Sequence, residues 1–384
     1  MENLTSQIRA LAQGADEATN SAILKGLRDL QLSLETRQDT MNRIAYAHLE
    51  PVVVNVGISL KLFEILSEAQ VPLTVDELAA KTGAALNLLG RILRYLAAAG
   101  TIKETGPGTF AANNITRHLS DPGVQSAVYH NIETIGPAAL ALRNFLIETN
   151  YQDITDPVHT PLQKAFNISL PAFAWAPTQP EKFEQFNLYM KTQREGLPEW
   201  LDVFPIVERV QQEGELDPDQ VLFVDVGGGV GHQSVALRGR LPDSVSNRII
   251  LQDMEPVVKL AIPCEGVEVM AHDFWKEQPV KGARFYYLRL ILHDYPEDKA
   301  VVLLKNLVAA LGPNSAILID ELVLPETGVS LYATQSDITM MSALAAQERT
   351  TGQWDALLEK AGLKIKERYV YTSRKDTILE CVPV

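Results

Sequence analysis

The stretch Val221-Leu-Phe-Val-Asp-Val-Gly-Gly-Gly-Val-Gly231 decides the fold of this chain. The residues before the glycines are apolar except for Asp225, a pattern typical of a buried strand in a parallel sheet. The strand runs directly into the glycines, and a helix is predicted to begin near His232. Glycine lets the backbone take positive φ and approach a ligand without a Cβ in the way. The stretch therefore predicts a strand, a ligand-binding turn and a helix of a Rossmann-like sheet.

The spacing of these glycines differs from that of a dinucleotide site. The fingerprint G-x-G-x-x-G, counted from Gly227 and Gly229, needs a third glycine where this chain has His232. The pattern is instead Asp-x-Gly-x-Gly-x-Gly, from Asp225 to Gly231. A carboxylate at this strand end suits a ligand that carries an ammonium group and no pyrophosphate.

The next two predicted strands also end near acids. Asp253 follows the second strand and is placed to hold both hydroxyls of a ribose, and Asp273-Phe274 after the third offers an edge and a face to adenine. The carboxyl ends of parallel strands meet at one sheet edge, where open α/β sheets bind ligands. The alternative is that each acid only caps a helix or turn. As a set, Asp225, Asp253 and Asp273 predict S-adenosylmethionine as the cofactor.

From residue 221 onward, strands and helices alternate, which predicts an α/β fold with a mostly parallel, doubly wound sheet. A helix is expected over Pro296–Leu311, and a terminal antiparallel hairpin closes the sheet. The predicted strands are Val221–Val226, Arg248–Leu251, Val267–Met270, Arg284–Leu290, Ala316–Val323, Lys364–Tyr371 and Thr377–Val382.

Residues 50–120 predict a winged helix, which is a helix, a turn, a second helix and a β-hairpin. Thr74-Val-Asp-Glu77 is a capping box, Leu86–Ala99 is the second helix, and Thr101–Glu104 pairs with Thr109–Ala111. We expect a helical and winged-helix dimerisation domain over 1–120, a helical connecting and substrate-pocket region over 121–205, and a catalytic domain over 206–384.

Composition narrows the class of partner. The net charge of −14 disfavours nucleic acid and anionic membrane surfaces, and no apolar run is long enough to cross a bilayer. Cys264 and Cys381 are expected to be small reduced core residues. No histidine or cysteine spacing fits a metal, so no metal site is expected. With no signal peptide visible, a cytoplasmic location is expected.

An apolar stripe at helical spacing occupies the N-terminal segment, at Leu4, Ile8, Leu11, Ile23, Leu27 and Leu30. Such a stripe needs a partner surface. It packs either on its own domain or in a dimer, and the sequence leaves both open.

Three further motifs follow the glycine turn: Tyr287-Leu-Arg-Leu-Ile-Leu-His-Asp-Tyr295, Asp320-Glu-Leu-Val-Leu-Pro325 and Gln347-Glu-Arg-Thr350. With the winged helix before them, they make the chain resemble the plant-type and fungal small-molecule O-methyltransferases over nearly its whole length. The resemblance implies a homodimer formed through the N-terminal domain.

The resemblance also implies residue roles. S-adenosylmethionine would be bound by the glycine turn (Gly227, Gly229, Gly231), Asp225, Asp253, Met254, Asp273, Phe274 and, where a lysine is common, Arg289. The general base would be His293, oriented by Glu321 and Glu348. A phenol has a pKa near 10 and histidine one of about 6.5, so His293 is a plausible base at neutral pH.

The acceptor is expected to be a small aromatic or polyketide-type metabolite with a phenol or enol hydroxyl. An aromatic cluster and several methionines suit a flat apolar ligand, although they also fit a core between domains. The candidate substrate contacts are His130, Phe173, Trp175, Met190, Met340 and Met341.

A second function stays open. Some fungal members of this family resemble the methyltransferases in fold and bind S-adenosylmethionine, yet catalyse dehydration and pericyclic cyclisation of pyridone-type metabolites without methyl transfer. In that group a pocket histidine near the position of His130 contributes. The intact set of His293, Glu321 and Glu348 favours methyl transfer, and His130 keeps the pericyclase alternative open.

Overall fold

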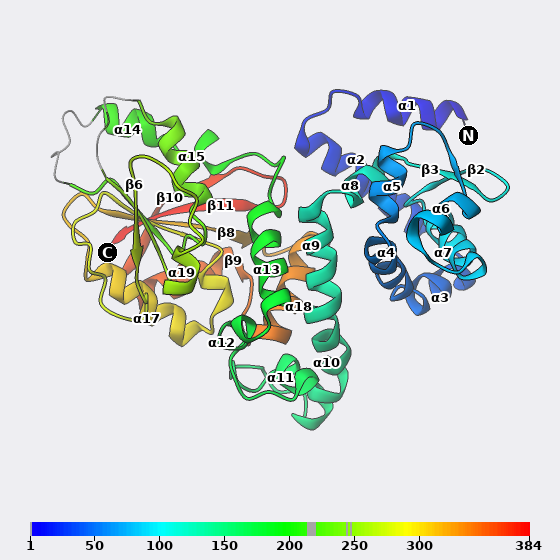
Figure 1. Cartoon of the computed structure of the whole chain (residues 1–384). Coiled ribbons are helices and arrows are strands. Elements are labelled where there is room, and N and C mark those ends of the chain that lie inside the picture. The colour runs from blue at the N-terminus through cyan, green and yellow to red at the C-terminus, as the bar shows by residue number, and fades with distance from the viewer. Residues whose placement is uncertain (1, 213–219, 243–244, 246–247) are drawn as a thin grey trace. The chain divides into compact units, whose positions relative to one another are not determined.

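The computed structural model describes residues 2–212, 220–242, 245 and 248–384 of the chain. It divides into two compact units. One, the sheet unit, contains Met1–Ala22, Ala141–Ala172 and Gly196–Val384, and the other, the helical unit, contains Ile23–Leu140 and Phe173–Glu195. Three helices have residues in both units, namely α2 (Glu17–Leu34), α10 (Gly136–Glu148) and α12 (Ala172–Trp175) (Figure 1).

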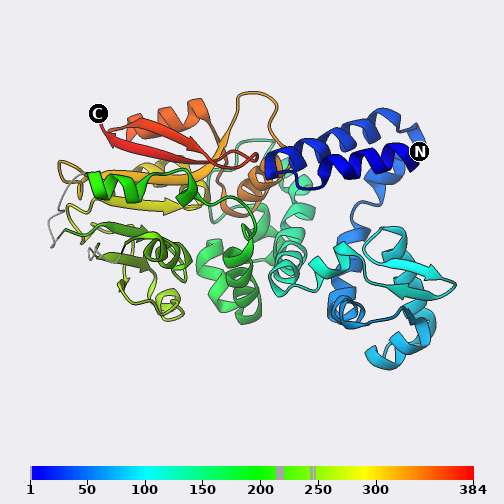
Figure 2. The same cartoon turned by 90° about the horizontal axis from the view of Figure 1, so that it is seen from above.

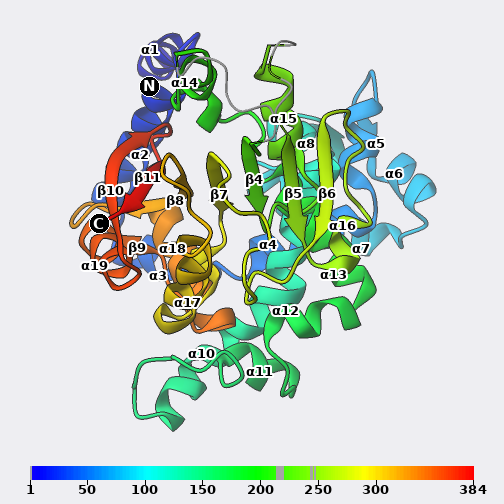
Figure 3. The same cartoon turned by 90° about the vertical axis from the view of Figure 1, so that its left-hand side faces the viewer.

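The sheet unit is built on one mixed sheet, whose strands lie in the order β10-β11-β8-β7-β4-β5-β6 (Figure 3). Strands β4 to β8 pair in parallel, whereas β11 pairs antiparallel with both β8 and β10. The short β9 pairs with β8 off this path. The strand bounds are β4 (Phe223–Val226), β5 (Ile249–Asp253), β6 (Val267–Ala271), β7 (Phe285–Arg289), β8 (Ala316–Leu324), β9 (Arg349–Thr350), β10 (Leu363–Val370) and β11 (Asp376–Pro383).

The strand predictions and the terminal hairpin are confirmed, with every strand end within two residues of its predicted position. Alternate residues of each strand enter two separate cores: Phe285 and Tyr287 on one face of β7, Tyr286 and Leu288 on the other. The inner strands β4, β7 and β8 are therefore buried on both faces, as the continuous apolar runs predicted.

Helices cover both faces of this sheet. The core that contains Tyr286 and Leu288 is completed by helices α17 and α19, and the opposite core by η3, α14 and α15. Figure 2 shows α19 beside the β10–β11 hairpin. The helices of the sheet unit are α1 (Glu2–Ala12), α11 (Pro161–Phe166), η3 (Trp200–Asp202), α14 (Ile206–Gln212), α15 (His232–Arg240), α16 (Glu255–Val258), η4 (Leu292–Asp294), α17 (Glu297–Val308), α18 (Leu331–Leu344) and α19 (Thr351–Lys360). Pro296 is the N-cap of α17, which ends at Val308 rather than at the predicted Leu311.

The direction of strand order reverses at β4, because the chain continues through β5 and β6 on one side and then crosses to β7 on the other. In open α/β sheets the crevice at such a switch point is where ligands bind. The fold therefore places the ends of β4 and β7 at the expected ligand site.

The helical unit contains the predicted winged helix. Thr74 caps α6 with a reciprocal bond to Glu77, and α7 ends before Gly100, as expected. Strand β2 begins two residues later than predicted, because Thr101 bonds back to the carbonyl of Leu96 and closes the end of α7. The bounds in this unit are α3 (Arg37–Ala45), α4 (Leu49–Ser59), α5 (Leu62–Glu68), β1 (Leu73–Thr74), α6 (Val75–Thr82), α7 (Leu86–Ala98), β2 (Lys103–Gly106), β3 (Thr109–Ala111), α8 (Asn114–Leu119), α9 (Pro122–His130), the π-helix η1 (Asn131–Ile135), η2 (Ala176–Thr178) and α13 (Pro180–Thr192).

Two further expectations concern single features. Cys381 is a core residue, but the prediction for Cys264 is wrong, because Cys264 lies in the connection after α16 and is only half-buried. Among the described residues, none of the helices has the length and apolar character needed to span a membrane.

Candidate active site

The glycine turn between β4 and α15 has the backbone that the sequence predicted. Gly227, Gly229 and Gly231 have φ values of +72°, +61° and +84°, which residues with a side chain rarely adopt. A Cβ at Gly227 would lie 2.7 Å from Ile291, and one at Gly231 would lie 2.6 Å from Leu251, whereas one at Gly229 would meet nothing within 4 Å. The backbone at Gly229 is thus open to a close approach by a ligand.

Gly228, which was not among the predicted site residues, is required for a different reason. A Cβ there would lie 2.4 Å from Cγ of Asp225 and 2.6 Å from Leu251. The turn therefore packs directly on the Asp225 carboxylate. The run of three glycines was the signal for this, but the contact depends on the packing.

Asp225 is the residue before the last in β4 and is buried beneath the turn. Its Oδ2 accepts a hydrogen bond of 2.8 Å from Ser234 on α15. Burial raises the pKa of Asp225 to about 6, and the bond from Ser234 and the charge of Arg289 act against that rise. A cationic group bound next to Asp225 would favour its ionised form.

Asp253, the last residue of β5, holds the turn from the other side. Its Oδ2 accepts from the backbone amide of Gly229 at 2.8 Å, and its Oδ1 accepts from that of Met254 at 2.7 Å. Burial raises the pKa of Asp253 and these two bonds oppose the rise. The carboxylate thus links the glycine turn to the end of the neighbouring strand.

The residues predicted at adenine follow β6. Phe274 is half-buried and lies against the turn, since a Cβ on Gly227 would come within 3.6 Å of its ring. The ring makes edge contacts with Trp275 and Tyr295, at centroid distances of 5.0 and 5.9 Å. Asp273 is exposed, as is Met254. The structure thus places an apolar face beside the turn and an exposed carboxylate before it in the chain, and adenine binding by these residues stays a prediction.

Arg289 ends β7, and its guanidinium lies against other protein groups. Nε lies 3.4 Å from Oδ2 of the fully buried Asp320, and Nη1 lies 3.4 Å from His232. Tyr287 and Tyr371 also donate to Asp320, at 2.6 and 2.7 Å. The structure therefore brings Arg289 to the predicted edge, close to Asp225, as part of a buried polar network.

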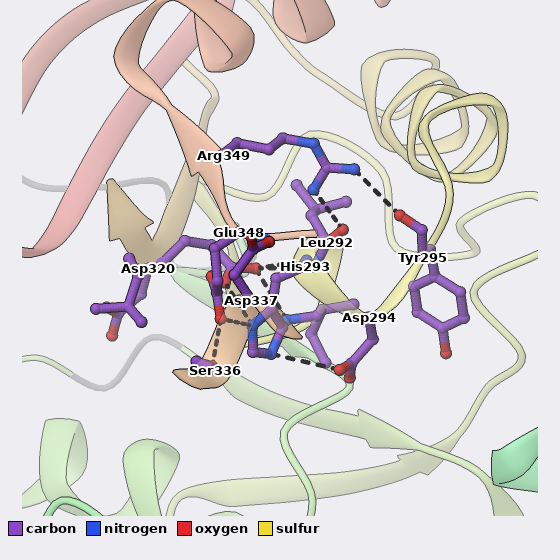
Figure 4. A network of polar contacts seen from close by, with 12 residues as sticks. Leu292, His293, Asp294, Tyr295, Asp320, Ser336, Asp337, Glu348 and Arg349 are labelled. Carbon is purple, nitrogen blue, oxygen red and sulfur yellow. Dashed lines mark hydrogen bonds and ion pairs between the residues drawn. The ribbon is translucent and has the colours of Figure 1, made fainter. Parts of the chain in front are cut away.

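His293 lies in η4, immediately after β7, with carboxylates at both ring nitrogens (Figure 4). Nδ1 is 2.9 Å from Oε1 of Glu348 and 3.9 Å from Oε2 of Glu321, and Nε2 is 3.4 Å from Oδ1 of Asp294. Ile291, two residues earlier, touches the glycine turn. The structure thus brings the three predicted catalytic residues together beside the predicted cofactor turn.

These carboxylates change the acid–base character of His293. Burial lowers its pKa, but Glu348, Glu321 and Asp294 outweigh that effect and raise it to about 10. The three carboxylates therefore hold the pKa of His293 above the ordinary value of about 6.5 that was assumed from sequence. Burial also raises the pKa of Asp294 to about 7, against the opposing charge of His293.

The backbone of η4 is held from two sides. Oε1 of Glu321 accepts from the amides of Ile291 and Leu292, at 3.0 and 2.8 Å. Arg349 donates to the carbonyls of Leu292 and Tyr295, at 2.8 and 3.1 Å (Figure 4). Next to this turn, Leu290 has φ +52°, a strained value for a residue with a branched side chain. Glu321 thus holds the backbone of the turn, and its other carboxylate oxygen lies 3.9 Å from the His293 ring.

His293, Glu321 and Glu348 also have the geometry of a possible metal site, with ligand atoms within 4.8 Å of one another. Spacing of histidine and cysteine could not reveal this cluster, because two members are glutamates from β8 and from the loop before β9. Since Nδ1 of His293 is engaged by Glu348, we still predict a hydrogen-bonded acid–base group rather than a metal site.

The predicted substrate contacts fall in both units. In the helical unit, His130 packs against Phe186 and Tyr189 at centroid distances of 5.4 and 5.8 Å, and Phe173 lies 6.3 Å from Phe186. Trp175 is buried and Met190 accepts from Gln193, also in this unit. Met340 and Met341 are half-buried on α18 of the sheet unit.

His130 stands out within this aromatic cluster. Burial, and then the charge of Lys182, lower its pKa to about 4, so the ring is neutral at physiological pH. Its Nδ1 is buried, and no described residue forms a hydrogen bond with it. The π-helix η1 begins at the next residue, and such π-turns occur frequently at functional sites.

Comparisons with known proteins show the family of this chain. The O-methyltransferase domain family matches residues 151–364, and the O-methyltransferase dimerisation domain family matches residues 42–120. Demethylsterigmatocystin 6-O-methyltransferase of Aspergillus parasiticus is 39% identical over 383 residues, covering 100% of this chain and 98% of the relative.

Two solved structures are similar over the same length. One is described as LepI in complex with SAM and the other as a pericyclic reaction enzyme. Each has a TM-score of 0.94 and 38% identity, and each comparison covers 100% of this chain and 98% of the other. The chain belongs to the O-methyltransferase family, with a dimerisation domain before an α/β methyltransferase domain.

Proposed function

We propose that this protein methylates a phenol or enol hydroxyl of a small aromatic or polyketide-type metabolite, with His293 as the general base. The observation that carries this proposal is the hydrogen bond of 2.9 Å between His293 and Glu348. His293 lies in the turn whose Ile291 touches the glycine turn. The cofactor is S-adenosylmethionine, which when bound supplies a methyl group activated by a sulfonium.

The cradle fits that cofactor. The open backbone at Gly229 accepts a close ligand, Asp225 offers a carboxylate to an ammonium group, and Asp253 and Phe274 offer a ribose acceptor and an adenine face. Met254, Asp273 and Arg289 complete this proposed binding set.

In the proposed reaction the neutral His293 ring carries its proton on Nδ1, in a hydrogen bond to Glu348, and Nε2, which lies 3.4 Å from Asp294, accepts the proton of the substrate hydroxyl. As that proton moves, the oxygen forms its bond to the methyl carbon and the carbon–sulfur bond breaks. Glu348, Glu321 and Asp294 then stabilise the imidazolium. Met340, Met341 and the aromatic cluster with His130 are the proposed acceptor contacts.

The activity test uses S-adenosylmethionine with panels of phenols, enols and pyridones, followed by mass spectrometry. Gain of one methyl group with release of S-adenosylhomocysteine supports methyl transfer. A dehydrated or isomerised product with the cofactor unconsumed overturns it.

The second candidate is a pericyclase or dehydratase that acts on a pyridone-type metabolite without methyl transfer. Two observations favour it: the half-buried His130, whose buried Nδ1 forms no hydrogen bond with a described residue, and the similarity to a structure described as a pericyclic reaction enzyme. In this mechanism a neutral His130 bonds a polar group of the substrate, and the cofactor charge polarises it without being consumed. The product analysis above separates the two functions.

The pH dependence of methyl transfer follows from the raised pKa of His293. The base must be neutral, so kcat is expected to rise about tenfold per pH unit between pH 6.5 and 9, and to level off near pH 10. Glu348→Gln removes one of the charges that raise this pKa and should move the rising limb to lower pH. If ionisation of the substrate alone caused the rising limb, the limb would stay at the same pH in this variant. A kcat that does not change from pH 6.5 to 9 would contradict the prediction.

We also propose a homodimer formed through the N-terminal segment. Two observations support this. The dimerisation domain family matches residues 42–120, and large apolar side chains are exposed at Leu24, Leu27, Leu30, Leu32, Leu34, Met41 and Ile44. A surface of this kind on a soluble chain marks an interface. Light scattering should give a dimer, and Leu24→Asp with Leu34→Asp should give monomers. The exposed Leu260 of the sheet unit provides the control, since Leu260→Asp should leave the dimer intact.

A further inference from the structure

Glu348 receives a second hydrogen bond that the proposed mechanism does not use. The hydroxyl of Ser336, on α18, donates to Oε1 of Glu348 at 2.6 Å. This is the same oxygen that lies 2.9 Å from Nδ1 of His293 (Figure 4). The next residue, Asp337, accepts from the backbone amide of Glu348 at 2.9 Å. Two consecutive residues of α18 therefore hold both the side chain and the backbone of Glu348.

The path of the chain makes this arrangement possible. Helix α18 ends at Leu344, and Ala345 takes the left-handed conformation with φ +55°, which turns the chain back. The turn brings Glu348 against α18 just before β9 begins at Arg349. Glu348 has no regular element of its own, so its position depends on these contacts.

The direction of the Ser336 bond is unusual for a residue inside a helix. A serine or threonine in a helix commonly donates to the carbonyl four residues earlier. Thr339, on the same helix, does this with the carbonyl of Gln335 at 2.9 Å. Ser336 instead donates to the carboxylate outside the helix.

Glu348 is also a costly residue to leave without donors. It is 3% exposed and lies near the fully buried Glu321. Buried carboxylates are stabilised by each donor they accept from, and such outer contacts fix the orientation of the groups they support. Removing the hydroxyl would take one of these donors away from Oε1.

We propose that Ser336 is a positioning residue, which holds Oε1 of Glu348 in line with Nδ1 of His293 and so sets the orientation and basicity of the ring. The inference rests on the proposed function of His293 as base. The charged groups around the His293 ring come from four elements. They are Asp294 in the same turn, Glu321 from β8, Glu348 and Arg349 at the start of β9, and, behind Glu348, Asp337 from α18.

The kinetic test compares Ser336→Ala, Ser336→Thr and the matched control Thr339→Ala. Ser336→Ala is expected to lower kcat about tenfold to hundredfold, with the KM for S-adenosylmethionine unchanged within about twofold. Ser336→Thr keeps the hydroxyl and should recover most of the activity, while Thr339→Ala should match the parent. Equal losses in Ser336→Ala and Thr339→Ala, or no loss in Ser336→Ala, would overturn the proposal.

A titration of the His293 ring tests the inference without any substrate. The O–H dipole of Ser336 offsets part of the Glu348 charge, so Ser336→Ala should raise the pKa of His293, by about half a unit or more. The measurement is ¹⁵N NMR of histidine-labelled protein, with the signal assigned through His293→Asn. A shift of the His293 pKa in Ser336→Ala but not in Thr339→Ala supports the inference. If no acceptor is methylated, that result counts against the proposed function alone and leaves this inference standing. An unmoved titration overturns it.

Discussion

His293→Asn is expected to lower kcat for methyl transfer about 10²- to 10⁴-fold, the usual contribution of a positioned general base. The variant removes the nitrogen at which the hydroxyl proton is accepted, while Glu321 still holds the backbone of η4 through the amides of Ile291 and Leu292. The cofactor cradle is therefore retained, and the dissociation constant for S-adenosylmethionine should change by less than about threefold.

The measurement combines steady-state kinetics with calorimetric titration of the cofactor. His118→Asn is a suitable control, because His118 is exposed in the helical unit. If His293→Asn keeps more than about a tenth of the parent kcat, His293 is not the base. If His130→Ala alone abolishes product formation and the cofactor is not consumed, the pericyclase mechanism replaces methyl transfer.

Asp253→Ala is expected to weaken binding of S-adenosylmethionine about 10²- to 10³-fold, because two effects add. The variant removes the proposed acceptor for the ribose hydroxyls. It also frees the amides of Gly229 and Met254, which Asp253 holds at 2.8 and 2.7 Å, so the glycine turn loses its tie to β5. Few other single changes act on both the ligand contact and the shape of its cradle.

Isothermal titration with S-adenosylhomocysteine measures this loss without turnover. Glu255→Gln removes a nearby carboxylate that is exposed and paired with Lys259, so the affinity of this variant should match the parent. Asp253→Asn, which keeps an acceptor oxygen, should fall between the two. An affinity for Asp253→Ala within about threefold of the parent would show that Asp253 does not contribute to the cofactor site.

Much of the fold followed from local patterns. The run from Val221 to Gly231 predicted β4, the turn and α15, because an apolar run typical of a buried strand is followed directly by glycines that can adopt positive φ. Alternation of apolar segments likewise located the other strands and the terminal hairpin. The boundary errors occur at strand and helix ends, where capping contacts such as Thr101 with Leu96 decide where an element stops.

The candidate site was predicted less evenly. The acids at strand ends could be found because parallel strands bring their carboxyl ends to one edge. The role of Gly228 was not predicted, because only the packing shows that a side chain there would collide with Asp225 and Leu251. Asp294 was quoted in a motif but had no assigned role, and Ser336 lies in a helix without any motif.

The sequence alone therefore determined the parallel sheet, the glycine turn and the identity of His293, Glu321 and Glu348, because each is written in a short local pattern or a family motif. Only the tertiary structure decided what those residues do to one another. Acids from η4, β8 and the loop before β9 converge on one imidazole and raise its pKa to about 10, and a serine from α18 bonds the same carboxylate. Charge and hydrogen bonding act through distances of a few ångströms in space, and those distances are fixed only when segments far apart in the chain pack together.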